Sequence, residues 1–306
     1  MAVLMGGDSA EREVSLMSGR EVAGALRQAG FRVDAVDLKP AQVDALAGRD
    51  FDVAFIALHG AFGEDGQLQR RLDELGLLYV GSGPDASRNS MDKVAAKNAF
   101  SAAGIPTPPW RVVAFGDEDA ARAAYRDLGP GVVVKPVDEG SSIGVTPADS
   151  PDAFREGLAA VFSTRREALI EQRWVGRELT VGVLHDEGLP VVEIVPGHTF
   201  YDYEAKYFDD ATQYVTDPAL PEGVESRVRS LAVAAHRALG CRDFSRVDFM
   251  LDGAGRPSAL EVNTIPGFTA HSLLPKSAAG AGIDFPLLCR TIVELALRRR
   301  SEGPGS

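Results

Sequence analysis

The sequence predicts a mixed α/β and α+β protein, with a parallel sheet in an N-terminal domain and antiparallel strands in later domains. Three observations support this prediction. Strand and helix patterns alternate over residues 2–58, a two-stranded hairpin is recognisable at 244–263, and a proline-rich connector interrupts the chain at 105–109. Alternating strands and helices favour a parallel sheet, whereas two strands joined by a tight turn pair antiparallel. With 306 residues the chain has room for two or three domains.

The composition is that of an ordinary globular protein, with 45% hydrophobic and 25% charged residues. The formal net charge of −12 argues against a general nucleic-acid binder, and it means that an anionic ligand needs local cations. Cys241 and Cys289 stand in no metal-binding spacing, so we expect buried thiols in a reducing compartment. We see no basic leader and no apolar run near the ~18–20 residues of a membrane helix. We therefore expect a cytoplasmic protein without membrane or nucleic-acid partners.

The N-terminal strands lead into two polar loops. The expected strands are 2–5, 31–38 and 52–58, and the expected helix after the first strand spans about 10–29. Asp8 or Ser9 can cap that helix. Glu11 follows the first strand and His59 follows the third, at the sheet edge where parallel-sheet proteins bind ligands. Glu11 could instead complete a capping box and His59 could be an ordinary loop histidine, but their shared edge favours a binding site.

The hairpin at 244–263 separates polar from apolar side chains. If its turn is symmetric, so that residue 252 faces residue 257, then Asp248 faces Glu261 and Arg246 faces Asn263. Alternation along the strands then gives two faces. The polar face holds Arg246, Asp248, Met250, Glu261 and Asn263, and the apolar face holds Val247, Phe249, Leu251, Leu260 and Val262.

Opposed carboxylates on the polar face of this hairpin indicate a cation. Two such groups directly opposite each other repel by up to about 1 kcal/mol, and a hard cation removes that cost. Carboxylate and amide oxygens without His or Cys suit Mg²⁺. The alternative is a solvated hairpin face with a cross-strand ion pair. Gly267, in the loop that follows, could let the backbone approach a ligand closely.

Nucleotide binding, if present, uses none of the common glycine motifs. No G-x-G-x-x-G follows the first strand, and the absence of any Gly-Lys dipeptide excludes a Walker A loop. Lys135 instead ends an expected strand at 132–136, directly before a loop at 138–145 that is rich in glycine and serine. Backbone N–H groups, hydroxyls and an ammonium group together suit a phosphate. A plain surface hairpin is the alternative.

The remaining segments give coarser predictions. A helix is expected from about residue 87, with Lys93 and Lys97 one turn apart, and the stretch 168–184 reads as strand, turn, strand. Glu171 and Glu178 lie on the two halves of that stretch, where they could accept hydrogen bonds from adenine or ribose or simply be solvated. A long loop, as in a lid, is expected at 196–217, and helices at about 222–239 and 284–299.

Seven stretches together resemble the D-alanine–D-alanine ligases of the ATP-grasp superfamily, in the order and spacing of that family. They are GGDSAEREVSLMSG (6–19), ALHGAFGEDG (57–66), GSG (81–83), MDK (91–93), VVKPVDEGSSIGV (133–145), TFYDYEAKY (199–207) and EVNTIPGFTAHSLLPK (261–276). The resemblance implies a three-domain ATP-grasp architecture and a homodimer. The domains would be an N-terminal α/β domain (1–90), a central ATP-binding domain (91–180) and a C-terminal domain with the metal and acceptor sites (181–306).

The resemblance also implies a reaction: ATP and two D-alanines give D-alanyl-D-alanine, ADP and phosphate through a D-alanyl phosphate, for peptidoglycan precursor synthesis. Two Mg²⁺, which Mn²⁺ can replace, would be held by Asp248, Glu261 and Asn263. The implied ATP contacts are Lys93, Lys135, Glu171, Trp174, Glu178 and Met250. The implied contacts to the first D-alanine and to the oxyanion are Glu11, His59, Ser141, Arg246 and Gly267. The implied contacts to the second D-alanine are Lys206, Ser272 and Leu273. Tyr207 and Ser141 would link to Glu11 and order a lid over the acyl phosphate.

The sequence departs from the family at one place and leaves two alternatives open. After Glu171 the family often has Lys and then an aromatic residue, whereas this chain has Gln172-Arg173-Trp174. The same fold could join D-alanine to D-lactate or to another acceptor, although in this family Tyr at position 207 goes with D-alanine and Phe with D-lactate. A non-catalytic nucleotide-binding module is the other alternative, and it predicts ATP binding without turnover.

Overall fold

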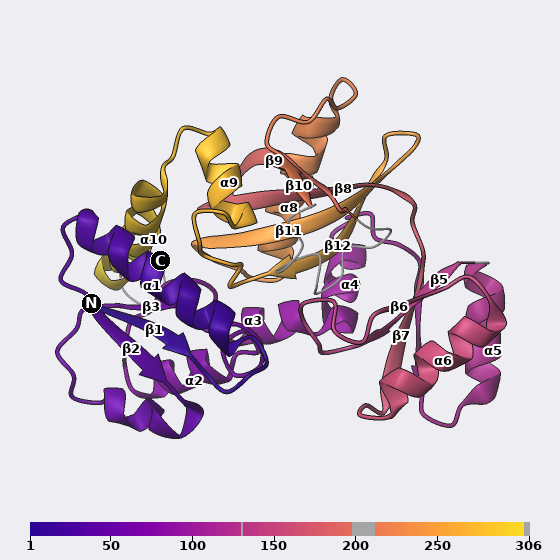
Figure 1. The fold of residues 1–306 in the computed structure, drawn as a ribbon, viewed down its shortest axis with the longest axis horizontal. Helices are drawn as coiled ribbons and strands as arrows, with labels where there is room; N and C mark the ends of the chain where they lie inside the picture. The colour runs from indigo at the N-terminus through magenta and orange to yellow at the C-terminus, as the bar shows by residue number, and fades with distance from the viewer. Residues whose placement is uncertain (130, 198–211, 303–306) are drawn as a thin grey trace.

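The computed structural model describes residues 1–129, 131–197 and 212–302, which form three sheets (Figure 1). The first sheet has the order β2-β1-β3 and is parallel, as predicted. Its strands are β1 (Ala2–Gly6), β2 (Asp34–Leu38) and β3 (Ala54–Ile56), and its helices are α1 (Arg12–Gln28), the 3₁₀ helix η1 (Pro40–Leu46) and α2 (Gln67–Glu74). The predicted cap of α1 is wrong, because Glu11 is the N-cap and Ser9 instead donates to the carbonyl of His59 (2.8 Å). This hydrogen bond joins the loops after β1 and β3.

The second sheet is small and antiparallel, with the order β4-β7-β5-β6. Its strands are β4 (Trp110–Ala114), β5 (Val132–Pro136), β6 (Thr146–Ala148) and β7 (Glu167–Gln172), and its helices are α5 (Glu118–Leu128) and α6 (Pro151–Phe162). Alternate strand residues pack against these two helices in one hydrophobic core. The sheet and its helices form a separate lobe, at the right of Figure 1.

The third sheet is the largest, with the antiparallel order β10-β9-β8-β11-β12. Its strands are β8 (Gly176–Leu184), β9 (Glu187–Val195), β10 (Gln213–Val215), β11 (Phe244–Asp252) and β12 (Pro257–Asn263), and α8 (Val224–Ala238) covers one face. The stretch 168–184 therefore needs a correction. It does contain two strands, but β7 belongs to the small sheet and β8 to the large one, so the segment between them crosses from one sheet to the other.

One expected helix is two. α3 (Pro84–Met91) ends at Asp92, and α4 (Lys93–Ala102) begins directly after it. The Asp92 carboxylate accepts hydrogen bonds from the backbone N–H groups of Val94 (2.9 Å) and Ala95 (3.0 Å). An aspartate in this role starts a new helix. The break reorients α4, and Lys93 and Lys97 keep their predicted spacing of one turn.

The hairpin has the predicted pairing at its functional end and a different pairing at its turn. Arg246 faces Asn263 and Asp248 faces Glu261 as expected, but Leu251, rather than residue 252, faces Pro257. The register shifts between Asp248 and the next residue. A β-bulge of this kind adds one residue to one strand and bends it. As a result Ala259, and not Leu260, joins the hydrophobic core under the sheet.

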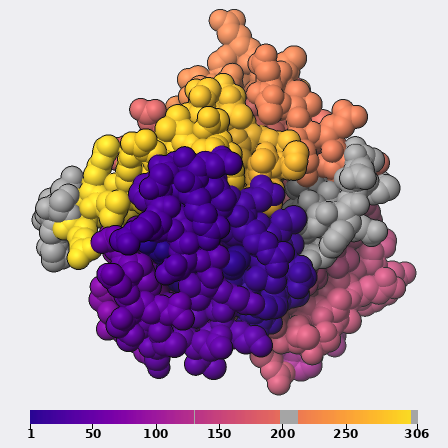
Figure 2. Space-filling model, turned by 60° about the vertical axis from the view of Figure 1, so that its left-hand side comes forward, coloured from indigo at the N-terminus to yellow at the C-terminus, as the bar shows by residue number. Residues whose placement is uncertain are grey.

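The C-terminal helices α9 (Leu273–Gly280) and α10 (Phe285–Glu302) return to the start of the chain. α10 packs against α1 in a core that also contains Val3 and Phe55 of the first sheet. In Figure 2 the yellow C-terminal segment lies directly against the indigo N-terminal one. Both cysteines are free thiols. None of the helices in the described part of the chain is long and apolar enough to cross a membrane.

Candidate active site

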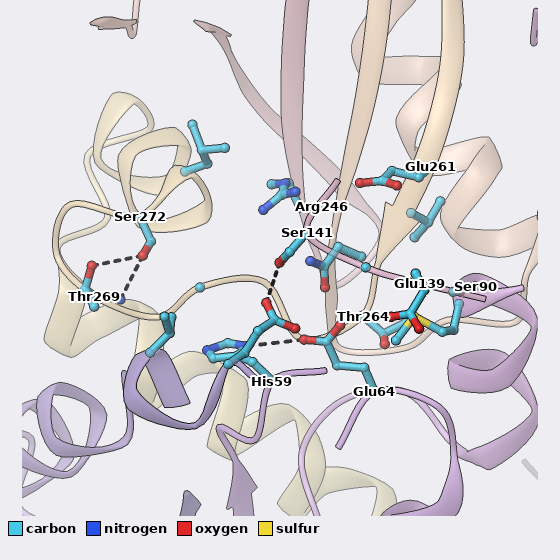
Figure 3. A pocket seen from close by; sticks show the side chains of 18 of the residues that line it. His59, Glu64, Ser90, Glu139, Ser141, Arg246, Glu261, Thr264, Thr269 and Ser272 are labelled. Carbon is cyan, nitrogen blue, oxygen red and sulfur yellow. Dashed lines mark hydrogen bonds and ion pairs between the residues drawn. The ribbon is translucent and has the colours of Figure 1, made fainter. Parts of the chain in front are cut away.

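A cavity of about 380 Å³ lies between the loops of the first sheet and the polar face of the hairpin (Figure 3). Its walls come from α1, from the loops after β1, β3 and β5, from the junction of α3 and α4, from β10, β11 and β12, and from the segment between β12 and α9. The following predicted residues line it: Glu11, His59, Lys93, Ser141, Arg246, Glu261, Asn263, Gly267, Ser272 and Leu273. The fold therefore gathers motifs that are far apart in the sequence around one space.

Glu11 places a buried carboxylate in the wall of this cavity. It is 6% exposed, and it accepts a hydrogen bond from the hydroxyl of Ser141, which comes from the loop after β5. Ser141 and Ser142 both have left-handed backbone (φ 50° and 58°), which costs energy for residues other than glycine. Gly60 leaves room for the carboxylate, because a Cβ there would lie 2.7 Å from Glu11 Oε2. An ordered carboxylate of this kind suits an ammonium group.

His59 is fixed by hydrogen bonds at both ring nitrogens. Nε2 lies 3.0 Å from the hydroxyl of Ser18, and Nδ1 lies 3.1 Å from the carbonyl of Ile265. Nδ1 also lies 3.3 Å from Glu64 Oε1 (Figure 3). Since a carbonyl only accepts, Nδ1 carries a proton. Burial raises the pKa of Glu64, and the hydrogen bond with His59 opposes that shift. Glu64 was not among the predicted site residues, although it belongs to the same sequence motif as His59.

The polar face of the hairpin has a tighter network than the sequence indicated. Asp248 is 5% exposed and accepts two hydrogen bonds from the guanidinium of Arg246, at 2.9 Å and 2.7 Å. It also accepts one from the hydroxyl of Thr180 on β8, at 2.6 Å. The Arg246–Asp248 ion pair on this face therefore runs along one strand. Thr180 was not predicted from the sequence, because the pairing of β8 with β11 is a long-range contact.

The oxygen atoms on this face fit a hard divalent cation. A carboxylate has about four lone-pair sites, so Asp248 can keep its three hydrogen bonds and still offer a lone pair. Glu261 faces it directly across the strands and lines the cavity with Asn263. Within the described ranges no three or more His, Cys, Asp or Glu side chains are grouped to hold a metal. A cation here would accordingly use two carboxylates and one amide, which is a set that suits Mg²⁺.

Ser272 closes the far side of the cavity at the start of α9. It is the N-cap of this helix, and its hydroxyl lies 2.9 Å from that of Thr269 and accepts from the N–H of Thr269 (3.1 Å) (Figure 3). A Cβ on Gly267 would lie 2.9 Å from Ser272 Oγ, so only glycine lets the two segments approach this closely. The first N–H groups of a helix attract anions, and Leu273 supplies one of them.

The predicted phosphate contacts lie around α4. The ammonium of Lys93 donates to the carbonyl of Glu139, in the loop after β5, and lines the cavity. The ammonium of Lys135 pairs with the carboxylate of Glu171, which is fully buried. Lys97 contacts the same carboxylate from α4. Lys97 was not among the predicted site residues, although its spacing from Lys93 already placed it on the same helical face.

The remaining predicted residues lie outside the cavity wall. Met250 and Glu178 pair in register on β11 and β8, so their side chains share a face with Asp248. Trp174 is half-buried in the segment that crosses from β7 to β8. Lys206 and Tyr207, with the stretch 199–207, lie outside the described residues.

Comparisons with known proteins agree with one another. The family model described as "D-ala D-ala ligase C-terminus" matches residues 99–294. The D-alanine–D-alanine ligase of Alcanivorax borkumensis is 46% identical over 98% of this chain and 94% of its own length. Two crystal structures of the D-alanine–D-alanine ligase of Bacillus anthracis, one of them complexed with ATP, are similar to this chain. Each match covers 99% of this chain and 99% of the solved chain. Their TM-scores are 0.87 and 0.84, and their identities are 36% and 34%.

Proposed function

Because this chain belongs to the D-alanine–D-alanine ligase family, we propose that it joins two D-alanines to D-alanyl-D-alanine for peptidoglycan precursor synthesis. The reaction consumes ATP and releases ADP and phosphate. The observation that best supports this function is the cavity itself. It combines a buried carboxylate for an ammonium group, oxygen atoms that fit a divalent cation and a helix N-terminus for a carboxylate. One amino acid bound between these groups has its carboxylate toward the phosphates and its amine toward Glu11.

In the first half-reaction the carboxylate of the first D-alanine attacks the γ-phosphorus of ATP. A carboxylate oxygen forms a new bond to phosphorus, the bond from phosphorus to the β–γ bridging oxygen breaks, and ADP leaves. Such a transfer needs positioning and neutralisation of charge more than covalent help from the protein. Glu11 holds the ammonium, His59 lies beside it, and Ser141 orders the Glu11 carboxylate. Lys93 and Lys135 neutralise phosphate charge.

In the second half-reaction the amine of the second D-alanine attacks the carbonyl of the acyl phosphate. The tetrahedral intermediate carries an oxyanion, which Arg246 and the N–H of Gly267 stabilise. Removing one such donor typically lowers the rate by ~10²–10³. The attacking nitrogen gives up a proton, which the departing phosphate takes up. Phosphate leaves with the electrons of its bond to carbon, and the amide forms. Ser272 and the N–H of Leu273 bind the carboxylate of the second D-alanine.

Lys206 and Tyr207 have roles that rest on their sequence motif. Lys206 joins Ser272 in binding the second carboxylate, and Tyr207 orders a lid over the acyl phosphate. Tyr207 also favours D-alanine over D-lactate as the acceptor.

Asp248, Glu261 and Asn263 would hold two Mg²⁺, or Mn²⁺ in its place. The bound cations would supply charge neutralisation at the phosphate oxygens. The protein's own contribution is to hold two carboxylates in register on neighbouring strands. Arg246 keeps Asp248 in place from the same strand.

The adenosine part of ATP lies between the small and the large sheet in this proposal. Glu171 accepts from the adenine amino group and Glu178 from the ribose hydroxyls, with Met250 and Trp174 against the ring. The B. anthracis structure complexed with ATP supports nucleotide binding by this fold. We keep three further proposals from the sequence: domains at 1–90, 91–180 and 181–306, a homodimer, and a cytoplasmic location.

Phosphate release tests the function directly. The protein is incubated with Mg-ATP and D-alanine, with L-alanine, or without an amino acid, and the product is analysed by mass spectrometry. Release with D-alanine alone, together with the dipeptide, is the expected result. ATP binding without release in any mixture would contradict the proposal and favour the non-catalytic module. Release with D-alanine only when a hydroxy acid is added would instead indicate a different acceptor.

A further inference from the structure

Lys97 is a buried lysine at the junction of the two sheets that the proposed nucleotide site joins. Its side chain is 1% exposed, and its ammonium contacts the Glu171 carboxylate of the small sheet. It also donates to the hydroxyl of Thr107 at 2.7 Å, and Thr107 donates to the carbonyl of Ala259 at 2.9 Å. Ala259 lies at the bulge of β12 in the large sheet. Lys97 is thus connected to both sheets, whereas nothing in the proposed chemistry uses it.

Glu171 has two cationic partners that differ in their surroundings. Its own side chain is 2% exposed, that of Lys97 is 1% exposed, and that of Lys135 is 15% exposed. Burial raises the pKa of Glu171, but the charges of Lys135 and Lys97 outweigh burial and the pKa lies below its usual range. Burial lowers the pKa of Lys97, and the charge of Glu171 opposes that shift. The ionised state of each group therefore depends on the other.

The two lysines cannot both remain paired with Glu171 once ATP binds. Lys135 is a proposed phosphate ligand, and an ammonium that moves toward a polyphosphate leaves its former carboxylate partner. A buried carboxylate without a counter-ion is strongly unfavourable and takes up a proton instead. Lys97 has no such second role, because it is enclosed and held by Thr107. Lys97 is therefore the lysine that remains paired with Glu171.

The protonation state of Glu171 matters for the choice of nucleobase. An ionised carboxylate only accepts hydrogen bonds, so it pairs with the 6-amino group of adenine and repels the 6-oxo group of hypoxanthine. A protonated carboxyl group donates as well, and it pairs with a 6-oxo group. A site whose buried polar groups match only one ligand discriminates strongly against the other.

We propose that Lys97 is a positioning residue that keeps Glu171 ionised and in place, and thereby favours ATP over a 6-oxopurine triphosphate. The inference rests on the proposed contact between Glu171 and adenine. Lys97 touches neither substrate in this proposal. It acts through the carboxylate that reads the base.

The test compares Lys97→Met with Lys97→Arg in the full-length enzyme. At saturating D-alanine, kcat and KM are measured for ATP and for inosine triphosphate. Lys97→Met should raise the KM for ATP at least ~10-fold. It should lower the nucleotide ratio, which is kcat/KM for ATP divided by kcat/KM for inosine triphosphate, by a similar factor. The KM for D-alanine should stay within about twofold, because Glu11 is untouched. Lys97→Arg keeps the charge and should retain most of the discrimination.

Phe100→Leu is the matched control for a structural effect. Phe100 is a fully buried core residue on the same helix, so this variant loosens the packing without removing the charge. It should leave the nucleotide ratio unchanged. Thermal unfolding identifies the variants that are folded, and Lys97→Gln replaces Lys97→Met if the latter is not.

Three results would overturn the inference. The first is a folded Lys97→Met variant with wild-type KM for ATP and wild-type nucleotide ratio. The second is a loss of nucleotide discrimination in Lys97→Arg as large as in Lys97→Met, and the third is an equal change of the nucleotide ratio in Phe100→Leu. Glu171→Gln separates this failure from failure of the proposed contact. If Glu171→Gln leaves the KM for ATP and the ratio unchanged, Glu171 does not read the base and both proposals fall. If it changes them while Lys97→Met does not, only the role of Lys97 falls.

Discussion

Replacing Gly60 by alanine should displace the carboxylate that we assign to the substrate ammonium. Gly60 has a φ of +76°, and a Cβ there would lie 2.7 Å from Glu11 Oε2 and 3.0 Å from Ser9 Oγ. Non-bonded contacts at the first distance do not occur for real Cβ atoms, so the Glu11 side chain must move. Its hydrogen bond from Ser141 would be disturbed as well. The substitution therefore acts on the site without changing any ligand-binding side chain.

The size of the effect follows from two separable costs. A left-handed alanine costs about 1–2 kcal/mol of stability wherever it occurs. Gly30→Ala is a control for this cost, since Gly30 has a φ of +90° and nothing within 4 Å of the added Cβ. Misplacing Glu11 weakens one charged hydrogen bond, worth about 1.5–3 kcal/mol. That corresponds to roughly a 10- to 150-fold loss in kcat/KM for D-alanine.

The assay is phosphate release with D-alanine as the varied substrate and Mg-ATP in excess, together with thermal unfolding of each variant. Gly60→Ala should lose at least as much stability as Gly30→Ala, but only Gly60→Ala should lose kcat/KM for D-alanine. The KM for ATP should be unchanged in both. Equal kcat/KM in the two variants would refute the assignment of Glu11 to the substrate ammonium, because the clash would then have no effect on binding.

Three further predictions concern the metal face, pH and stability. Glu261→Gln should abolish most turnover without lowering the melting temperature, and wild-type rates in that variant would contradict the metal assignment. Burial lowers the pKa of His236 to about 4 from an unfolded value of 6.5, so the unfolded chain takes up the proton first as the pH falls. The free energy of unfolding should therefore decline by up to about 3 kcal/mol between pH 6.5 and pH 4, and His236→Gln should flatten this slope in chemical denaturation. The Asp243 carboxylate pairs with Arg299 and accepts a hydrogen bond from the N–H of Gly81 (2.7 Å). Asp243→Asn removes its charge and should cost about 1–3 kcal/mol of stability. A change in KM for either substrate in this variant would show that the junction also shapes the site.

The sequence allowed the parallel sheet and the opposed carboxylates to be predicted, because both depend on local periodicity. Alternation fixes which side chains of a strand share a face, and Asp248 does face Glu261. The predicted pairing near the turn was wrong, however. The turn is offset by one residue, and a bulge next to Leu260 restores the predicted register. No composition marks a bulge, which depends on how the strand must bend against its neighbours.

Other features could not be predicted because they arise from long-range packing. The short segment between β7 and β8 looks like a turn locally, and only the formation of two sheets makes it a crossing. The contacts of Thr180 with Asp248 and of Lys97 with Glu171 join elements that the sequence alone does not bring together. Asp92 is different, since an aspartate before a helical run is a recognisable cap that could have separated α3 from α4.

The order of synthesis gives the last helix a particular importance. The core around the first sheet includes Val3 and Phe55 but is completed by Leu288, Ile292 and Val293 of α10. Ribosomes add about 5–20 residues per second, so α10 leaves the ribosome on the order of 10 s or more after β3. Throughout that interval the nascent chain exposes an apolar surface that its own end will later cover. The first sheet therefore cannot complete its core until the end of the chain has been made, and a chain that stops before α10 leaves this surface open to aggregation and proteolysis.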